Sequence, residues 1–157
     1  MAGSSKKNSV GNRKEAFGAY YFAVHIEGEN IEDNFFRSCS GLKSESEVQE
    51  IAEGGVNTTT HKLIGRTKFP NIVLKKGFSG PPYTLWNLRQ RYLDDSGKKL
   101  KRFSGVIIQK GPGKSEARWS FRDGWICKWE GPDFDASKNE VSIETIEIAH
   151  EGLTKLA

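Results

Sequence analysis

The sequence predicts a mostly β protein, a β-sandwich or β-barrel with one α-helix packed on its outside. Most segments of the chain alternate apolar and polar residues with the two-residue period of a strand. The 17 glycines in 157 residues supply turns between such strands. Only one long segment shows the 3.6-residue period of an amphipathic helix. A chain of this length can bury one core without a disulfide or a metal.

Two strands are expected near the beginning of the chain. Between Tyr20 and Glu27 the apolar residues stand mainly at even positions, so Val24 and Ile26 should face the core. After a turn, the segment 35–42 forms a second strand, and its small residues imply close packing of the backbone.

The segment from Lys43 to Glu53 keeps the alternation with almost no apolar residue, which predicts a strand that faces water on at least one side. Its four acidic residues are Glu45, Glu47, Glu50 and Glu53. Two interpretations stay open: charge that protects a solvated edge strand from aggregation, or an acidic wall around something.

The segment 54–69 has no period and is rich in glycine, threonine and lysine. We expect a long loop, and loops of this length inside a domain are usually functional or bound to a partner. Pro70 then opens a strand in which Ile72, Leu74 and Phe78 share one face.

One amphipathic helix is predicted over residues 81–95, where Leu85, Leu88 and Tyr92 form an apolar stripe. Two prolines suit its first turn, and Gly97 can end it. We interpret the helix as a cover for the sheet, although its arginines can also meet an acidic partner.

The segments 100–110 and 116–129 are predicted to form a hairpin around the turn Gly-Pro-Gly-Lys. One face of the second arm is mostly aromatic: Ala117, Trp119, Phe121, Trp125, Cys127 and Trp129. Its basic residues lie on the other face, whereas a platform for single-stranded nucleic acid needs aromatic and cationic side chains on the same face. We therefore interpret the aromatic row as core.

The last strand is predicted over residues 139–153, and its apolar pattern changes phase. Val141 and Ile143 point to one side, whereas Ile146 and Ile148 point to the other. Either a bulge near residues 144–145 re-aims the second half, or a second molecule covers one of the two faces.

The net charge of +4 is concentrated at the beginning of the chain. Residues 1–18 hold four basic residues and one glutamate, a net of +3, which leaves +1 for the remainder. We expect a flexible or partner-ordered basic arm over residues 1–18 and one folded domain over residues 19–157. The alternative function suggested by this charge is a small basic nucleic-acid-binding β-domain.

No arrangement of residues suggests catalysis or a cofactor. Gly113, Lys114 and Ser115 resemble the end of a phosphate-binding loop, but Ile108 stands where that motif needs a glycine. The histidines lie in separate segments without the spacing of metal ligands: His25, His61 and His150. We predict no enzyme activity, no metal and no cofactor.

The two cysteines, Cys39 and Cys127, lie far apart and predict a reduced, intracellular protein rather than a disulfide framework. Both are expected to be small core residues. The longest apolar runs are only a few residues, so no membrane anchor is expected.

Six strings are distinctive, in this order along the chain: SGLKSESEVQEIAEGGVN, KLIG, FPNIVLKKGF, RWSF, KWEGPDFDA and NEVSIETIEIAHEGL. Together they resemble the phage tail tube protein family, which includes the inner-tube proteins of contractile tails and contractile injection systems. The resemblance extends from about Tyr20 to Leu153, and residues 1–18 fall outside it. The string KLIG departs from the family pattern because it lacks the proline expected there.

This resemblance implies a β-barrel of tail-tube type, of which six copies close into a ring, with rings stacked into a hollow tube inside a contractile sheath. It implies a structural subunit that binds itself, the sheath protein, and baseplate and terminator proteins, with DNA or protein cargo in the lumen. Such a tube would be assembled in the bacterial cytoplasm and belong to a phage tail or an injection particle.

The resemblance also gives expected roles to individual segments. The segment around 54–68 would reach the adjacent ring, with the candidates Gly54, Gly55, Asn57, His61, Lys62, Arg66 and Lys68. Candidates for the lumen wall are Glu45 and Glu47. Candidates for contact with a neighbouring subunit are Ile146 and Ile148, and those for contact with the sheath are Arg89 and Arg91 on the helix.

Overall fold

The computed structural model describes residues 22–28, 36–52, 54–55, 60–78, 81, 83–93, 101–111, 115–137 and 140–156. Nine strands and one helix lie in this described part of the chain. In order they are β1 (Phe22–Ile26), β2 (Phe36–Ser40), β3 (Glu45–Ala52), β4 (Thr60–Lys68), β5 (Ile72–Gly77), α1 (Thr84–Leu93), β6 (Phe103–Lys110), β7 (Glu116–Glu130), β8 (Ile143–Ala149) and β9 (Gly152–Leu156). The predicted mostly β fold with one helix is confirmed.

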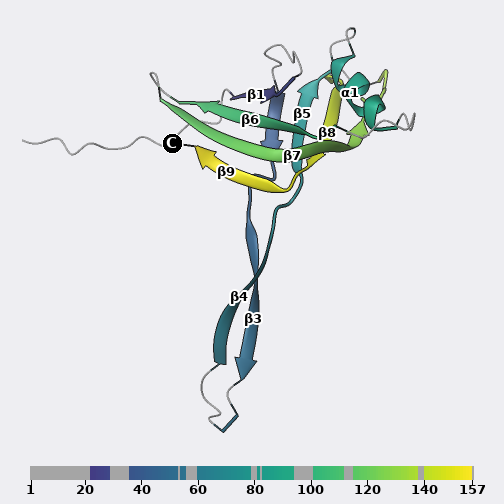
Figure 1. Cartoon of the computed structure of the whole chain (residues 1–157). Coiled ribbons are helices and arrows are strands. Elements are labelled where there is room, and N and C mark those ends of the chain that lie inside the picture. Colours follow the sequence, from purple (N-terminus) through teal and green to yellow (C-terminus); the bar gives the residue numbers. More distant parts are fainter. Residues whose placement is uncertain are drawn as a thin grey trace, which may run out of the picture.

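The body of the molecule is one antiparallel sheet that curls back on itself (Figure 1). Its strands follow the order β1-β6-β7-β8-β5-β2. The long strand β7 is shared, because its first half also pairs with β9 and its second half pairs with β8. The strands at the two ends of this order, β1 and β2, contact each other, and the rings of Phe22 and Phe36 stack there with centroids 6.5 Å apart. Two half-sheets, β1-β6-β7-β9 and β7-β8-β5-β2, therefore face each other.

The core lies between these half-sheets and α1. Val24 and Ile26 face it, as predicted from the alternation in β1, and α1 contributes Leu85 and Leu88 from its apolar stripe. The largest fully buried side chains are Phe121, Ile72, Leu74, Leu85, Ile107, Ile126, Ile146 and Ile148. Complete burial of one such side chain contributes about 1.5–3 kcal/mol to the free energy of folding. No helix in the described part of the chain is long and apolar enough to cross a bilayer.

The buried face of β7 changes side at a bulge. Asp123 has a positive φ of 54°, and the pairing of β7 with β6 is shifted at this point. After the bulge the buried residues are Gly124 and Ile126, so Trp125 and Cys127, which were predicted to face the core, are only half-buried. The prediction of one continuous apolar face was wrong here because an extra residue reverses which side chains point inward.

The segment predicted as one last strand forms two strands, β8 and β9, which are separated by His150 and Glu151. The pairing of β5 with β8 is continuous from Ile72 opposite Ile148 to Gly77 opposite Ile143. No bulge therefore occurs at residues 144–145, and this alternative was wrong.

The even-numbered residues of β8 all face the core. Ile146 and Ile148 are 0% exposed in a single subunit, which contradicts their predicted role in contact with a neighbouring subunit. Glu144 lies on the same buried face, and a carboxylate at this position produced the apparent change of apolar phase. Val141 precedes the strand and is 71% exposed.

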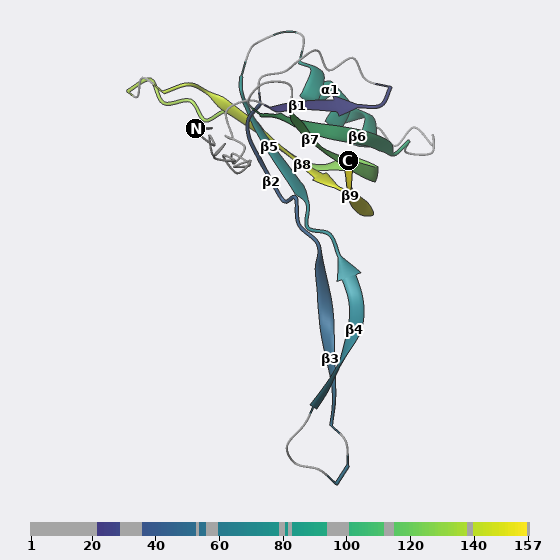
Figure 2. The ribbon, with the colours of Figure 1, turned by 90° about the vertical axis from the view of Figure 1, so that its left-hand side faces the viewer.

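A two-stranded ribbon formed by β3 and β4 extends away from the body in two perpendicular views (Figures 1 and 2). Strand β3 confirms the strand predicted over residues 43–53. The loop predicted over residues 54–69 was wrong in its second part, because residues 60–68 form β4. Both faces of β4 are exposed, so its sequence has no alternation of buried and solvated positions by which to recognise a strand.

The ribbon leaves the body at a narrow waist. Gly41 has a φ of +89°, and a Cβ at this position would lie 2.0 Å from the carbonyl oxygen of Asn71. Only glycine at position 41 allows these two segments of the backbone to pass so closely. Beside the waist, the two ring nitrogens of His150 lie 3.1 Å from the carbonyl oxygens of Pro70 and Gly152. This histidine joins the base of the ribbon to the connection between β8 and β9.

Candidate assembly surfaces

The ribbon pairs acidic residues of β3 with basic residues of β4. Glu45 lies opposite Lys68, Glu50 lies opposite Lys62, and Lys68 forms an ion pair with Glu47. One edge strand of the ribbon is thus acidic and the other is basic. The two glutamates that the sequence suggested as a lumen wall, Glu45 and Glu47, lie on this projecting ribbon, and both are neighbours of Lys68.

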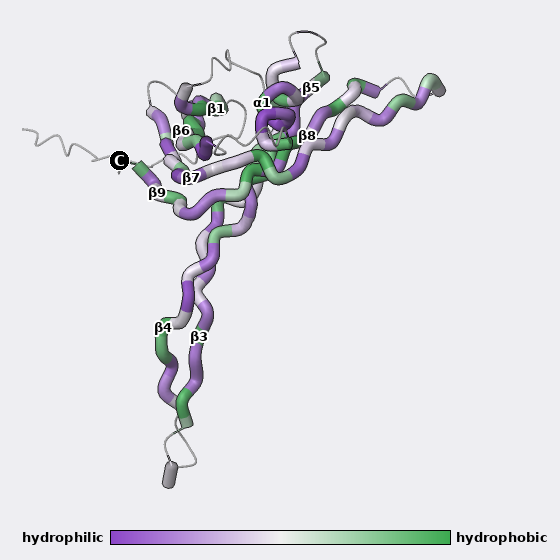
Figure 3. Tube along the Cα trace, turned by 45° about the vertical axis from the view of Figure 1, so that its right-hand side comes forward, coloured by the Kyte–Doolittle hydropathy of each residue, from purple (hydrophilic) through white to green (hydrophobic). Residues whose placement is uncertain are grey.

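The ribbon also exposes apolar side chains on both faces. Val48 lies opposite Ile64 on one face, whereas Ile51 and Leu63 lie on the other. Ile64 is 90% exposed, and apolar stretches are visible along both strands although no part of the body covers them (Figure 3). A two-stranded hairpin is only marginally stable alone in water. The exposed apolar side chains of the ribbon are therefore typical of a surface that another molecule covers.

The predicted inter-ring residues occupy two different settings on this ribbon. Gly54 and Gly55 lie in an exposed turn beyond β3, and Asn57 lies outside the described residues. Four further candidates are all exposed on β4, which is a strand instead of the predicted loop: His61, Lys62, Arg66 and Lys68.

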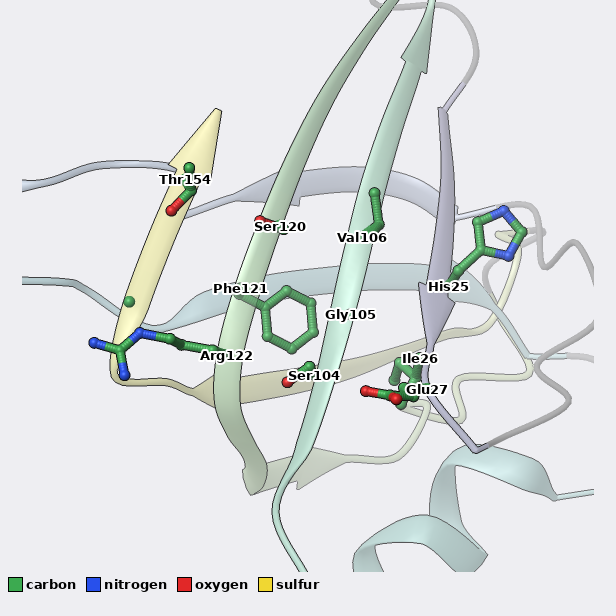
Figure 4. Close-up of a pocket in the computed structure, with 11 residues that line it drawn as sticks. His25, Ile26, Glu27, Ser104, Gly105, Val106, Ser120, Phe121, Arg122 and Thr154 are labelled. Carbon is green, nitrogen blue, oxygen red and sulfur yellow. The ribbon is translucent and has the colours of Figure 1, made fainter. Parts of the chain in front are cut away.

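A polar surface that the sequence analysis missed covers the outer face of the β1-β6-β7-β9 half-sheet. Four residues form one cross-strand row, His25, Val106, Ser120 and Thr154. A second row contains Glu27, Ser104 and Arg122, and the side chains of both rows surround a shallow cavity of about 490 Å³ (Figure 4). The signal was present in the alternate positions of these strands, but it needed the strand order to be seen as one surface.

This polar face is not a basic patch. A guanidinium nitrogen of Arg122 lies 3.4 Å from a carboxylate oxygen of Asp123, and one of Arg118 lies 2.7 Å from a carboxylate oxygen of Glu116. Because each of these arginines is paired with a carboxylate, the face lacks the concentrated positive charge that nucleic-acid binding needs. The described residues therefore do not favour the nucleic-acid-binding alternative.

An aromatic groove of about 420 Å³ lies beside α1. Its aromatic lining residues are Phe78, Tyr83, Trp86, Trp129 and Phe134. The rings of Trp86 and Trp129 meet edge to face with centroids 4.7 Å apart. The indole N–H of Trp129 donates a 3.2 Å hydrogen bond to Glu144, which fixes one wall of the groove to the buried face of β8.

The described residues of the connection between β7 and β8, 131–137 and 140–142, form an acidic projection next to this groove. Phe134 at its side is 83% exposed. Its carboxylates are Asp133, Asp135 and Glu140. Hydrogen bonds from the hydroxyl and backbone N–H of Ser137 lower the pKa of Asp135, so this carboxyl is charged at neutral pH.

The two arginines of α1 have different surroundings. Arg89 is half-buried and donates a 2.6 Å hydrogen bond to the carbonyl oxygen of Ile126, and its contact with the sheath stays a prediction. Arg91 is exposed and can meet a partner.

The cysteines Cys39 and Cys127 are free and half-buried, and burial raises the pKa of Cys39 to about 11. Within the described ranges, no group of three or more His, Cys, Asp or Glu residues can hold a metal.

Comparison with known families gives one match along most of the chain. The family model described as T4-like virus tail tube protein gp19 matches residues 18–154. Among curated protein sequences, none matches.

Several solved structures share the fold. A chain in the cryo-EM structure of the six-fold symmetrised baseplate of the anti-feeding prophage is 25% identical, with a TM-score of 0.76 over 90% of this chain and 96% of that chain. A chain of the extended sheath-tube complex of the extracellular contractile injection system PVC is 20% identical, with a TM-score of 0.77 over 92% and 94%. A chain of the PVC sheath/tube terminator is 21% identical, with a TM-score of 0.78 over 92% and 99%.

Proposed function

Because this chain belongs to the T4-like virus tail tube protein gp19 family, we propose that it is a non-enzymatic subunit of the inner tube of a contractile injection system or a contractile phage tail. Six copies form a ring, and rings stack into the tube. The similar chains in a six-fold symmetrised baseplate and in a sheath-tube complex support this proposal.

The observation on which the proposal rests most directly is the exposed ribbon. Its apolar side chains face water on both sides in a lone subunit, and such surfaces are rare on proteins that act as monomers. A repeating assembly covers them, because each copy offers its ribbon to another copy in the same way. We propose that the ribbon reaches the adjacent ring, with the cationic residues of β4 among its contacts.

The polar half-sheet is the better candidate for the lumen wall. Its outer strands β1 and β9 each have an edge without a ladder partner in the described residues, and pairing of these edges between copies would close the six half-sheets into one barrel. The inner face would then present hydroxyl groups of Ser104, Ser120 and Thr154 to passing cargo. We propose this face as the lumen wall in place of Glu45 and Glu47, which lie on the ribbon.

Other contacts follow from the same arrangement. Arg91, which is exposed on the outer helix, is more accessible to a sheath protein than the half-buried Arg89. Baseplate and terminator proteins would contact the two ends of the tube, and DNA or a protein effector would pass through it. We propose assembly in the bacterial cytoplasm and a tube domain over residues 19–157, whereas the arm expected over residues 1–18 lies outside the described residues.

The experiment is negative-stain electron microscopy of the purified full-length protein over a range of concentrations. Six-fold rings or tubes with a hollow centre are expected. A protein that stays monomeric at every concentration, and in the presence of a purified sheath or baseplate partner, contradicts the proposed function.

A further inference from the structure

The acidic projection and the aromatic groove together form an exposed surface that the proposed tube does not yet explain. Phe134 lies between them and lines both hollows. Val141 is also exposed on the projection, so the surface has apolar side chains surrounded by carboxylates. Its described residues, 131–137 and 140–142, include three carboxylates and no basic residue.

The complementary chemistry occurs on β4. This strand contains Lys62, Arg66 and Lys68 and no acidic residue, and its Ile64 is the most exposed apolar side chain of the ribbon. The two surfaces therefore match in both respects: exposed apolar side chains can cover each other, and the charges around them are of opposite sign. The β3 edge of the ribbon, with its glutamates, has the wrong charge for this contact.

Contact between the two surfaces requires a second copy. The ribbon and the projection extend from the body in different directions, which is visible in both turned views (Figures 2 and 3). Different patches of one chain that meet between copies make a heterologous contact, which generates rings or stacks instead of a closed pair.

We propose that the acidic projection and aromatic groove of one subunit receive the β4 side of the ribbon from a second subunit. Ile64 then packs against Phe134, and Lys62 and Arg66 face the carboxylates of Asp133 and Glu140. The proposal depends on the proposed tube function and adds the acceptor surface for the ribbon.

Photocrosslinking tests the contact directly. The variant Phe134→p-benzoylphenylalanine is assembled and irradiated, and crosslinked peptides are identified by mass spectrometry. Crosslinks between copies to residues 60–68 are expected, while the same group at the exposed position Arg37 on β2 should not reach these residues. Crosslinks from position 134 to the arm of residues 1–18, to β3 or to another surface overturn the proposal.

Charge reversal provides a second test. The pair Asp133→Lys with Glu140→Lys, and the pair Lys62→Glu with Arg66→Glu, are each expected to lower the yield of sedimentable tubes at least about tenfold. The four changes together should recover most of the yield. Equal thermal unfolding of all subunits confirms that the folds are intact, and no recovery in the combined variant contradicts the contact.

The two proposals fail in different ways. If the unmodified protein forms tubes but position 134 crosslinks elsewhere, only the acceptor surface is wrong. If no ring or tube forms under any condition, the proposed function itself is wrong.

Discussion

The ammonium group of Lys76 lies 3.6 Å from the carboxylate of Glu144, and both side chains are almost completely buried. The two residues are opposite each other in the β5–β8 pairing, at the end of a row of core residues. Trp129 donates a hydrogen bond to the same carboxylate. The pair therefore forms the floor of the aromatic groove.

Removal of one partner of this pair should strongly destabilise the subunit. Glu144→Ala removes the carboxylate that lies beside the buried Lys76 ammonium and accepts the Trp129 hydrogen bond, and the free energy of unfolding is expected to fall by about 3–5 kcal/mol. The double variant Lys76→Met with Glu144→Leu should stay within about 1–2 kcal/mol of the original protein, because it removes both charges. Urea unfolding of unassembled subunits checks this, and equal losses in the two variants would argue against a stabilising pair.

The two apolar residues Ile146 and Val141 should differ in their effect on stability. Ile146→Ala removes a fully buried side chain and should lower the free energy of unfolding by about 2–5 kcal/mol. Val141→Ala changes an exposed side chain and should alter it by at most about 0.5 kcal/mol. Thermal or urea unfolding of the two variants distinguishes them, and a similar cost at both sites would contradict the buried face assigned to β8.

Removal of the ribbon should affect assembly but not the fold. The ribbon strands β3 and β4 pair only with each other, so replacement of residues 46–67 by a short Gly-Ser turn should leave the body intact. Circular dichroism and thermal unfolding should show a folded subunit, while electron microscopy should show no stacked rings. Normal tubes from this variant would refute the assignment of the ribbon to contacts between rings.

The lumen assignment predicts selective chemical protection. Ser120→Cys and Thr154→Cys, in a background with both native cysteines changed to serine, should react in assembled tubes with a small methanethiosulfonate. They should not react there with a large polyethylene glycol maleimide. Arg91→Cys on α1 is the control and should react with both reagents. Rapid labelling of Ser120→Cys tubes by the large reagent would place this face on the outside.

The half-buried thiol of Cys39 predicts a loss of stability in alkaline solution. Its pKa rises from 9.0 to about 11 on folding because burial disfavours the thiolate. From about pH 9 to 11 the unfolded chain loses this proton while the folded chain keeps it, so the free energy of unfolding falls as the pH rises. The melting temperature should therefore drop between pH 9 and pH 11, and the drop should be smaller in Cys39→Ser. An identical drop in both proteins would exclude this thiol as a cause.

Local patterns in the sequence were sufficient for most elements of the body. The alternation around Val24 and Ile26 predicted β1 and its buried face, and the stripe that contains Leu85 and Leu88 predicted α1. The hairpin of β6 and β7 was predicted from two alternating segments around a glycine-rich turn. These features depend on residues close together in the chain, where side-chain period and burial are directly related.

The sequence was less informative where tertiary contacts decide the outcome. The bulge at Asp123 reverses the inward face of β7, and no residue type in this segment predicts a bulge. Glu144 occupies a core position because Lys76, distant in sequence, lies opposite it. The aromatic groove and the polar face each combine side chains from three or more segments, so neither could be recognised before the strand order was known.

The waist at Gly41 has a mechanical consequence. It joins the ribbon to β2 and β5, which pair with each other, and β5 also pairs with β8. The hydrogen bonds between antiparallel strands run perpendicular to the strands. Tension along the ribbon therefore applies shear to the hydrogen bonds on both sides of β5. Many of these hydrogen bonds must break at once before the strand can slide. Rings linked through the ribbon as proposed would therefore transmit axial force while each subunit stays folded.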